Sequence, residues 1–416
     1  MKVLHVNAGL SGGAAIAARR LHDSLAGQGV ESRFLYPFGA APDPTYVPYA
    51  TGLAAALRAG WQHFQIRSMA PWLWGRRVDY EIFSDSRHAL PLSARAPGFA
   101  PDVLHLHWTA GFLAYRSFFS GVPAPFPVVW TLHDMHAFTG GCHYSFGCER
   151  FTRACGSCPQ LGFLRAESDP SRQNFLLKRD ALRGRNLHVV ADSRWLEGEA
   201  RRSAVLAEAR SFRTIHYGVD VAAFSPKPRT ECRRALGLAQ DAFIVCFGAQ
   251  THANRRKGMP EMLAALGRLR SRPRLLALAF GDAMPKLPAE LPPVRSLGAL
   301  SSADALATAY GAADVFVIPS LAEAFGQTAL EAMACARPVV GFDTGGIPDM
   351  VIPGRTGLLA RAGDPAALAE SIGWMDEHPG EREEMGHRAR AMVEAQFTLD
   401  RQAQSYGALY RSIAGG

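Results

Sequence analysis

Short apolar runs that end in turn residues recur along the chain and are typical of buried parallel strands. In the first half they lie at residues 2–7, 31–37, 101–108, 128–133 and 188–193. In the second half they lie at residues 243–248, 275–281, 313–319 and 339–342. Segments with helical periodicity separate the runs, among them residues 14–27 and a helix that starts near Gln327. This alternation predicts an α/β fold with a parallel sheet in each half.

The length and composition fit two globular domains. At 416 residues the chain is too long for one ordinary core, and its 48% apolar and 20% charged residues are typical of globular proteins. No apolar run approaches the roughly 20 residues that a membrane span needs. Residues 1–7 lack the long apolar region of a signal peptide. We therefore expect a cytoplasmic protein.

The net charge of +8 lies in the first half. Residues 1–215 carry 24 Lys and Arg against 16 Asp and Glu, whereas residues 216–416 carry 21 of each. This asymmetry predicts an anionic partner for the first half, such as a membrane surface or a phosphorylated substrate. The chain carries no helix-turn-helix, RNP or zinc-finger signature, so no nucleic-acid partner is expected. A basic bias of the genome is the alternative explanation.

Aromatic residues alternate with arginines between residues 53 and 83. Trp61 and Phe64 stand among Arg58 and Arg67, for example. Aromatic rings and guanidinium groups both favour the headgroup layer of a bilayer, so the segment suits an interfacial surface. Core packing beside a solvated basic edge is the alternative. On the first interpretation, the segment contacts a lipid-linked acceptor or an anionic membrane at the inner face of the plasma membrane.

Two carboxylates mark the stretch 320–346. Glu323 and Glu331 are eight residues apart, the first in a loop after an apolar run and the second two turns into the helix that follows. A helix N-terminus just past the carboxyl end of a parallel strand attracts phosphates. Carboxylates beside it would accept hydrogen bonds from the hydroxyl groups of a sugar and a ribose. Ordinary solvated charges are the alternative.

Three segments of the second half carry a resemblance to a known family. Residues 319–346 resemble the E-x7-E region of the retaining glycosyltransferases of family 4, which have the GT-B fold. Residues 215–224 (IHYGVDVAAF) resemble the family's PNGVD-x-x-x-F link between domains, and residues 255–258 (RRKG) resemble its RKG motif. The resemblance implies two Rossmann-like domains facing each other across a cleft. The expected parts are an acceptor-binding domain at 1–215, a nucleotide-sugar-binding domain at 216–395 and a helix at 396–416 that packs back on the first domain.

The resemblance also implies roles for residues of the donor site. Glu323 would lie close to the donor sugar, and Glu331 would bind the ribose. Lys257 matches the lysine of the RKG motif, while Arg256, or else Arg255, would replace the arginine that usually follows the preceding strand. Backbone near Gly298 would read the nucleobase. The implied donor site comprises Arg256, Lys257, Gly298, Glu323, Phe325, Gly326, Gln327 and Glu331.

In the first half, a glycine-rich loop and two histidines mark the expected acceptor side. Gly12 and Gly13 lie between the first strand and its helix, as in a Rossmann-like unit, although a tight turn is the alternative. His107, His133 and Asp134 follow strands whose carboxyl ends should meet at one sheet edge. The resemblance implies that the glycines touch the acceptor or the leaving group and that His133 approaches the donor sugar. His133, Glu323 and Lys257 are then the expected catalytic residues.

Four of the seven cysteines fall within 17 residues, inside an expected insertion at about 138–162. Cys142, Cys148, Cys155 and Cys158 form a C-x5-C-x6-C-x2-C array that predicts a structural zinc ion. Disulfides, an iron–sulfur site, or ligation by His143 in place of one cysteine are the alternatives. A subset of bacterial family 4 enzymes has similar HD, TGGCHY and CGxCP segments in the same order. Four thiolates leave no open coordination position, which argues against a catalytic metal.

The resemblance thus implies an enzyme that moves a sugar from a UDP- or GDP-sugar to an acceptor hydroxyl with retention of configuration. The acceptor would be a glycan or a lipid-linked glycan in bacterial surface polysaccharide assembly. The leaving diphosphate would take the acceptor proton in a front-face attack. The resemblance also implies that catalysis needs no cofactor, in accord with the absence of a DxD motif. The alternatives are a sugar-nucleotide epimerase or hydrolase of the same fold and a non-catalytic nucleotide-sugar-binding protein.

Overall fold

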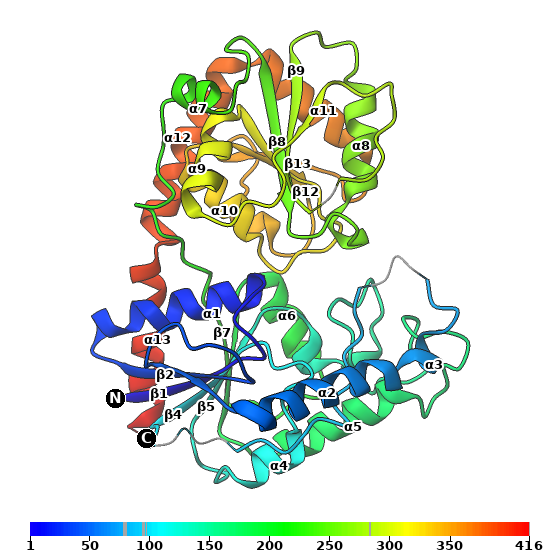
Figure 1. Ribbon diagram of the computed structural model, residues 1–416, viewed down its shortest axis with the longest axis vertical. Helices are drawn as coiled ribbons and strands as arrows, with labels where there is room; N and C mark the ends of the chain where they lie inside the picture. Colours follow the sequence, from blue (N-terminus) through cyan, green and yellow to red (C-terminus); the bar gives the residue numbers. More distant parts are fainter. Residues whose placement is uncertain (78–80, 94–95, 97, 283, 416) are drawn as a thin grey trace. The chain divides into compact units, whose positions relative to one another are not determined.

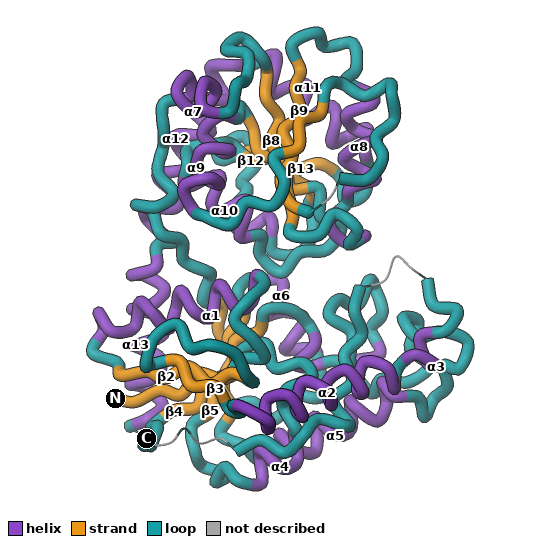
Figure 2. The backbone as a smooth tube through the Cα atoms, viewed as in Figure 1, coloured by secondary structure: helices purple, strands orange, loops and turns teal. Residues whose placement is uncertain are grey.

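The chain forms two compact units, each built on a parallel sheet (Figures 1 and 2). The computed structural model describes all residues except 78–80, 94–95, 97, 283 and 416. Unit 1 comprises Met1–His216 and Leu399–Gly416, and unit 2 comprises Tyr217–Thr398. The α/β class and the two parallel sheets predicted from the hydrophobic pattern are confirmed.

Among the described residues, seven parallel strands form the sheet of unit 1, in the order β3-β2-β1-β4-β5-β6-β7. Their bounds are β1 (Lys2–Val6), β2 (Glu31–Tyr36), β3 (Tyr46–Pro48), β4 (Val103–Leu106), β5 (Val128–Leu132), β6 (Leu187–Ala191) and β7 (Ser211–Thr214). The order reverses between β1 and β4. This switch point is where open α/β sheets bind ligands, outside the carboxyl ends of the strands.

The C-terminal helix completes unit 1. The helices of this unit are α1 (Gly13–Ser24), α2 (Gly52–Ser68), α3 (Ala70–Leu73), α4 (Tyr115–Ser120), α5 (Pro170–Leu182), α6 (Arg194–Arg202) and α13 (Leu399–Ala414), with 3₁₀ turns η1 (Leu25–Gln28), η2 (His136–Phe138) and η3 (Arg150–Thr152). Tyr406 and Tyr410 of α13 share one buried cluster with Val3 of β1 and Leu21 of α1. The end of the chain therefore contributes to the core that its beginning starts.

Unit 2 repeats the design with a six-stranded parallel sheet in the part of the chain that the structure describes, ordered β10-β9-β8-β11-β12-β13. Its strands are β8 (Phe243–Ala249), β9 (Leu275–Gly281), β10 (Val294–Ser296), β11 (Val315–Ile318), β12 (Val339–Phe342) and β13 (Gly357–Ala360). Its helices are α7 (Arg229–Ala235), α8 (Met259–Arg268), α9 (Ala303–Ala312), α10 (Gln327–Ala334), α11 (Pro365–Glu377) and α12 (Pro379–Gln396), with η4 (Arg255–Lys257) and η5 (Ile347–Asp349). Here the switch point lies between β8 and β11.

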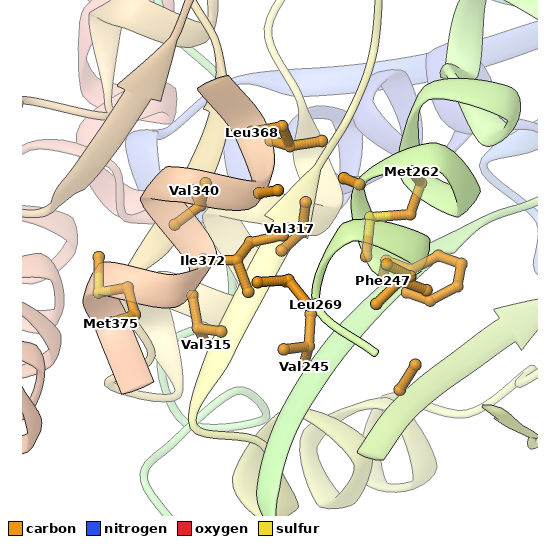
Figure 3. Packing of buried hydrophobic residues seen from close by; sticks show 14 of the residues in the cluster. Val245, Phe247, Met262, Leu269, Val315, Val317, Val340, Leu368, Ile372 and Met375 are labelled. Atoms are coloured by element: carbon orange, nitrogen blue, oxygen red, sulfur yellow. The ribbon is translucent and has the colours of Figure 1, made fainter. Parts of the chain in front are cut away.

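The core of unit 2 lies between one face of this sheet and the helices α8 and α11 (Figure 3). Val315 and Val317 of β11 are two residues apart and therefore point to the same face. Ile372 of α11 and Met262 of α8 pack against that face. This packing fixes the ends of β8 and β11, from which the loops of the candidate site emerge.

No helix of the described residues combines the length and the apolar character that a membrane span needs. Residues 78–80 of the predicted interfacial segment lie outside the described residues, and most of the rest forms α2 and α3.

Candidate functional site

In unit 2, the loops that follow β8 and β11 lie side by side at the switch point. The carbonyl of Arg256 accepts a hydrogen bond from the N–H of Leu321 at 2.7 Å. Gly258 has a φ of +70°, and a Cβ at this position would lie 1.7 Å from the carbonyl oxygen of Pro319. Only glycine therefore allows the two loops to approach so closely. This close approach brings the predicted basic residues to the predicted carboxylate.

Glu323 is the centre of this contact. Its Oε2 accepts hydrogen bonds from Lys257 Nζ at 2.6 Å and from Ser320 Oγ at 3.1 Å. Arg256 Nη1 lies 3.3 Å from the same oxygen and also donates to the carbonyl of Ala322. Arg255 instead pairs with Glu261. Of the two arginines considered for the site, the structure therefore brings Arg256 to Glu323.

The two cations keep Glu323 ionised. Burial by itself would raise the pKa of this carboxyl, but the charges of Lys257 and Arg256 and the hydrogen bonds from Lys257 and Ser320 lower it to about 2. In this structure, Lys257 Nζ forms an ion pair with the Glu323 carboxylate at 2.6 Å. A diphosphate that entered the site would therefore compete with, or share, this ion pair.

Glu331 lies on α10, the helix that follows this loop. Its Oε2 accepts a hydrogen bond from the hydroxyl of Tyr310 in α9 at 3.2 Å. Gly326 precedes the helix with a φ of +110°, and a Cβ there would meet Ile318 at 2.9 Å. Gln327 is the first residue of the helix. The glycine thus turns the chain sharply enough to begin α10 next to the end of β11.

Two further residues of the predicted donor site lie elsewhere. Phe325 is buried, and its ring meets those of Tyr217 and Phe397 at 5.6 and 5.8 Å, so it packs in the interior of unit 2. Gly298 follows β10 with a φ of +67°, and its carbonyl accepts a hydrogen bond from the N–H of Gly281. The structure thus places Gly298 beside the end of β9.

A pocket at the ends of β8 and β11 contains a histidine that the sequence analysis missed. Lys257, Ser320, His252 and Thr328 line it, together with residues of the two strands. Burial lowers the pKa of His252, and the charge of Asp282 opposes that shift. Its Nε2 is buried and has no hydrogen-bond partner among the described residues. The only signal in the sequence was its place in the loop after a strand.

In unit 1, the predicted acceptor residues also follow strands at the switch point. Gly12 has a φ of +88° and precedes α1, and Gly13 is the first residue of that helix. His107, His133 and Asp134 line one hollow at the ends of β4 and β5. The structure thus brings the two histidines and the aspartate together.

Asp134 is held by three donors. Its Oδ2 accepts hydrogen bonds from Trp108 Nε1 at 2.8 Å and from His143 Nδ1 at 2.7 Å, and its Oδ1 accepts one from the N–H of His136 at 2.8 Å. Burial would raise the pKa of this carboxyl, but His143 and His136 lower it far below its usual range. Asp134 is therefore an ionised, fixed acceptor.

A chain of imidazoles runs from the sheet interior to this hollow. His5 Nδ1 lies 2.9 Å from His107 Nε2, and His107 Nδ1 lies 3.2 Å from His133 Nε2. Burial lowers the pKa of His133 to about 4, despite the opposing charge of Asp134, and lowers those of His5 and His107 well below their usual range. The three rings are therefore neutral at neutral pH. His5 was not predicted as a site residue, because it occupies a position inside β1 where an apolar residue is usual.

Hydrogen-bond geometry constrains the protons along this chain. A neutral imidazole has one donor and one acceptor, and His5 Nε2 is buried without a hydrogen-bond partner in the described structure. An unpaired acceptor costs less than an unpaired buried N–H. The favoured arrangement therefore has His5 donating to His107 and His107 donating to His133. In that arrangement, His133 carries its own proton on Nδ1.

The four predicted metal ligands also lie together. Cys142, Cys148, Cys155 and Cys158 line one hollow in unit 1, and none of the described cysteines forms a disulfide. The structural zinc ion stays a prediction.

Part of the chain matches the model of a known family. Residues 241–377 match the family model "Glycosyl transferases group 1". A D-inositol 3-phosphate glycosyltransferase of Pseudarthrobacter chlorophenolicus is 31% identical over 231 residues, which are 48% of this chain and 53% of that protein. One of Actinosynnema mirum is 36% identical over 212 residues, or 46% and 50%. The chain thus spans about half the length of the curated relatives it matches.

Two solved structures match the fold over their full length. Sucrose-phosphate synthase from Thermosynechococcus elongatus has a TM-score of 0.71 at 22% identity, covering 100% of this chain and 99% of that chain. Anabaena HepE in complex with UDP and glucose has a TM-score of 0.66 at 18% identity, covering 99% and 100%. The predicted GT-B fold is confirmed. The matched residues 241–377 hold the Lys257–Glu323 pair and α10.

Proposed function

We propose that this protein is a retaining glycosyltransferase that moves a sugar from a UDP- or GDP-sugar to an acceptor hydroxyl. The observation that carries the proposal is the contact of Lys257 and Arg256 with Glu323 at the switch point of unit 2, next to a pocket that Lys257 lines. Two cations and a helix N-terminus suit a diphosphate. The structural neighbour HepE is described in complex with UDP and glucose, which supports a nucleotide donor of this kind.

The proposed mechanism assigns each group one task. Lys257 and Arg256 stabilise the negative charge that develops on the leaving diphosphate. Glu323 positions the sugar by accepting hydrogen bonds from its hydroxyl groups, and its pKa of about 2 keeps it ionised for that task. Glu331 binds the ribose. In a front-face attack, the acceptor oxygen bonds to the sugar carbon as the bond to the diphosphate breaks, and the diphosphate takes the acceptor proton.

Unit 1 is assigned the acceptor. The carboxylate of Asp134 is fixed by its own three donors and can accept a hydrogen bond from a sugar hydroxyl. The positive charge of residues 1–215 favours an anionic acceptor, such as a phosphorylated or lipid-linked glycan.

A stripe of exposed apolar residues on α2 supports contact with an anionic membrane. Leu53, Leu57, Trp61 and Phe64 follow helical spacing on one face of α2, and all four are exposed. Arg58 and Arg67 lie on the same helix. Apolar side chains beside arginines bind the headgroup layer of a bilayer. We assign the α2 stripe, defined by these four residues, to that contact.

Calorimetric titration with UDP, GDP and ADP tests the donor site. We expect one nucleotide to bind, and Glu331→Ala to weaken it by about 10- to 100-fold because a charged hydrogen bond to the ribose is lost. Glu370→Ala, which removes an exposed carboxylate on α11, is the matched control and should bind as the parent does. Unchanged binding by Glu331→Ala would refute the donor site and favour a different role for this fold.

Turnover of the donor separates the transferase from the other enzymes of this fold. With the nucleotide identified, the corresponding sugar nucleotides are incubated with and without a glycan acceptor. A transferase releases nucleotide stoichiometrically with acceptor glycosylation. Conversion of the donor at the same rate without any acceptor would instead identify an epimerase or a hydrolase.

A further inference from the structure

The cysteine cluster of unit 1 lies outside the proposed donor and acceptor residues. Cys142 follows η2, Cys148 precedes η3, and Cys155 and Cys158 lie between η3 and α5. Cys142, Cys155 and Cys158 are buried, and Cys148 is half-buried. Four thiols from an irregular stretch of 17 residues thus converge on one hollow.

Two of the alternative explanations do not fit the geometry. All four cysteines are unpaired, so disulfides do not brace the loop. His143 cannot replace a cysteine ligand, because its Nδ1 bonds Asp134 at 2.7 Å and its Nε2 bonds Ser84 Oγ at 2.9 Å. Both ring nitrogens are therefore occupied. A metal site here must be built from the four sulfurs.

Glycine lets the loop pack closely beside one of the cysteines. Gly140 packs so closely that a Cβ would lie 2.8 Å from that of Cys155 and 2.4 Å from the carbonyl of Ser171. The loop is thus folded tightly around the sulfurs.

A buried cation stands beside the cluster. Lys178 of α5 is fully buried, and its ammonium donates to the backbone carbonyls of His136 and Thr139. Thr139 in turn donates from its hydroxyl to the carbonyl of Cys142 at 2.6 Å, which links Lys178 to the cysteine loop. A buried charge is costly without a nearby opposite charge, and a metal centre bound by four thiolates carries net negative charge. Lys178 is therefore placed where such a centre needs a counter-charge.

The spacing of the sulfurs separates two possible occupants. Zinc binds cysteine at about 2.3 Å, so a tetrahedral site holds its sulfurs roughly 3.8 Å apart. Among the described residues, His5, His105 and His107 form a group of metal-ligating side chains whose ligand atoms all lie within 4.8 Å of one another. No three of the four described cysteines of the cluster form such a group. The sulfurs therefore lie farther apart here than the ligands of a tetrahedral zinc ion do. An iron–sulfur cluster inserts a core of iron and sulfide between the thiolates and needs the wider spacing.

The walls of the hollow also suit a cluster. Phe83 and Phe151 line it beside the four cysteines, and the closing Cys158-Pro159 pair follows a C-x2-C spacing, as in iron–sulfur proteins. We propose that Cys142, Cys148, Cys155 and Cys158 bind a [4Fe–4S] cluster that braces the loop between β5 and α5. The cluster is structural, because all four irons have a cysteine ligand and none is open to a substrate.

Metal and sulfide analysis of the whole chain tests the proposal. The protein is purified without oxygen, and iron, zinc and acid-labile sulfide are measured per chain, together with the visible absorption spectrum before and after dithionite. We expect about four irons and four sulfides per chain and a broad visible absorption that dithionite bleaches. One zinc per chain without iron, an absence of both metals after reconstitution with iron and sulfide, or a disulfide among these cysteines would each overturn the cluster.

A matched pair of variants assigns the ligands. Cys158→Ala should lower the bound iron at least severalfold, whereas Cys232→Ala, which removes an equally buried thiol from α7 of unit 2, should keep the parent content. Lys178→Met is a second variant that leaves all four ligands in place. We expect it to lower the midpoint potential of the cluster, because the positive charge of Lys178 no longer stabilises the more negative, reduced form. Full iron content in Cys158→Ala, or equal loss in both cysteine variants, would contradict the assignment. Nucleotide binding on unit 2 is a separate measurement, so failure of the cluster does not affect the proposed donor site.

Discussion

The switch points of the two units differ in the charge of the side chains that line them. In unit 2 a buried carboxylate, Glu323, is held by the charged groups of Lys257 and Arg256. In unit 1 the strands that lead to the switch point carry imidazoles, and burial keeps those of His107 and His133 uncharged at neutral pH. The same topology thus presents a charged surface in one sheet and a largely neutral hydrogen-bonding surface in the other.

The difference matches the chemistry proposed for each unit. A diphosphate needs cations at fixed positions, and Lys257 and Arg256 supply them. A sugar hydroxyl needs donors and acceptors in a defined direction, which neutral imidazoles provide when their tautomers are fixed by neighbours. In unit 1 this arrangement requires buried imidazoles that resist protonation. The resulting loss of unfolding free energy at low pH should be measurable.

Acidification should distinguish the units most strongly. The folded pKa of His133 is about 4 and its unfolded pKa is about 6.5, so below pH 6.5 the unfolded state binds a proton that the folded state does not. Unit 1 should therefore lose about 1.4 kcal/mol of unfolding free energy per pH unit for each such histidine as the pH falls from 6.5 towards 4. The depressed pKa of Glu323 acts lower on the scale, because its stabilisation is complete above about pH 4.5 and is lost as the pH falls towards 2.

Hydrogen exchange read by mass spectrometry at pH 7.5, 6.5 and 5.5 measures both units in one sample. After correction for intrinsic exchange, peptides of β4 should lose protection while those of β8 change little. His5→Gln, which removes one buried imidazole, should make the decline in unit 1 shallower. Equal losses of protection in β4 and β8 would show that the neutral imidazoles do not set the difference.

Removal of a cation from unit 2 should have the next largest effect. Lys257→Ala takes away the 2.6 Å partner of Glu323 and a charge proposed to stabilise the diphosphate. We expect kcat for sugar transfer to fall by about 10²- to 10³-fold. Arg255→Ala is the control, because Arg255 is two residues away and pairs with Glu261, so it should stay within about twofold of the parent. A similar fall in both variants would mean that general positive charge, rather than the contact with Glu323, matters.

The charged site could be predicted from the sequence, because its residues lie in loops, where charged side chains have few structural roles. Lys257 and Glu323 lie in the segments that follow the apolar strands β8 and β11, and the structure brings them into contact. The two parallel sheets were predictable for the same reason, since buried parallel strands appear as apolar runs. Edge strands such as β7 (SFRT) lack that signal and were not predicted.

The histidine chain was not readable from the sequence. His5 and His107 are about a hundred residues apart, and nothing local indicates that β1 and β4 are neighbours. A histidine inside a strand looks like an exception to the apolar pattern, and its function depends on a partner from another strand. His252 was missed for a related reason, because its role depends on the pocket that the end of β11 completes.

Substitution of Gly258, the glycine at the loop contact of unit 2, should have a smaller effect. Gly258→Ala adds a Cβ that would lie 1.7 Å from the carbonyl of Pro319, at a φ of +70°. We expect it to lower the free energy of unfolding by about 1–3 kcal/mol. Gly298→Ala is the control, because Gly298 has a similar φ of +67° but nothing within 4 Å of a Cβ. Chemical denaturation of both variants should show the larger loss for Gly258→Ala, and equal losses would remove the steric argument for the loop contact.

The smallest expected effect is on the surface of unit 1, where the α2 stripe adds an apolar contact to the positive charge. Leu57→Ser should lower binding to phosphatidylglycerol vesicles by about three- to tenfold, because one apolar side chain no longer enters the bilayer interface. Ile66→Ser is a matched control, since Ile66 and Leu57 are both 67% exposed but Ile66 lies roughly half a turn away around α2. Co-sedimentation with these vesicles, and with neutral phosphatidylcholine vesicles, measures the binding. Equal losses in the two variants would show that the α2 stripe does not face the membrane, and binding that survives in neutral vesicles would show that the positive charge of unit 1 does not contribute.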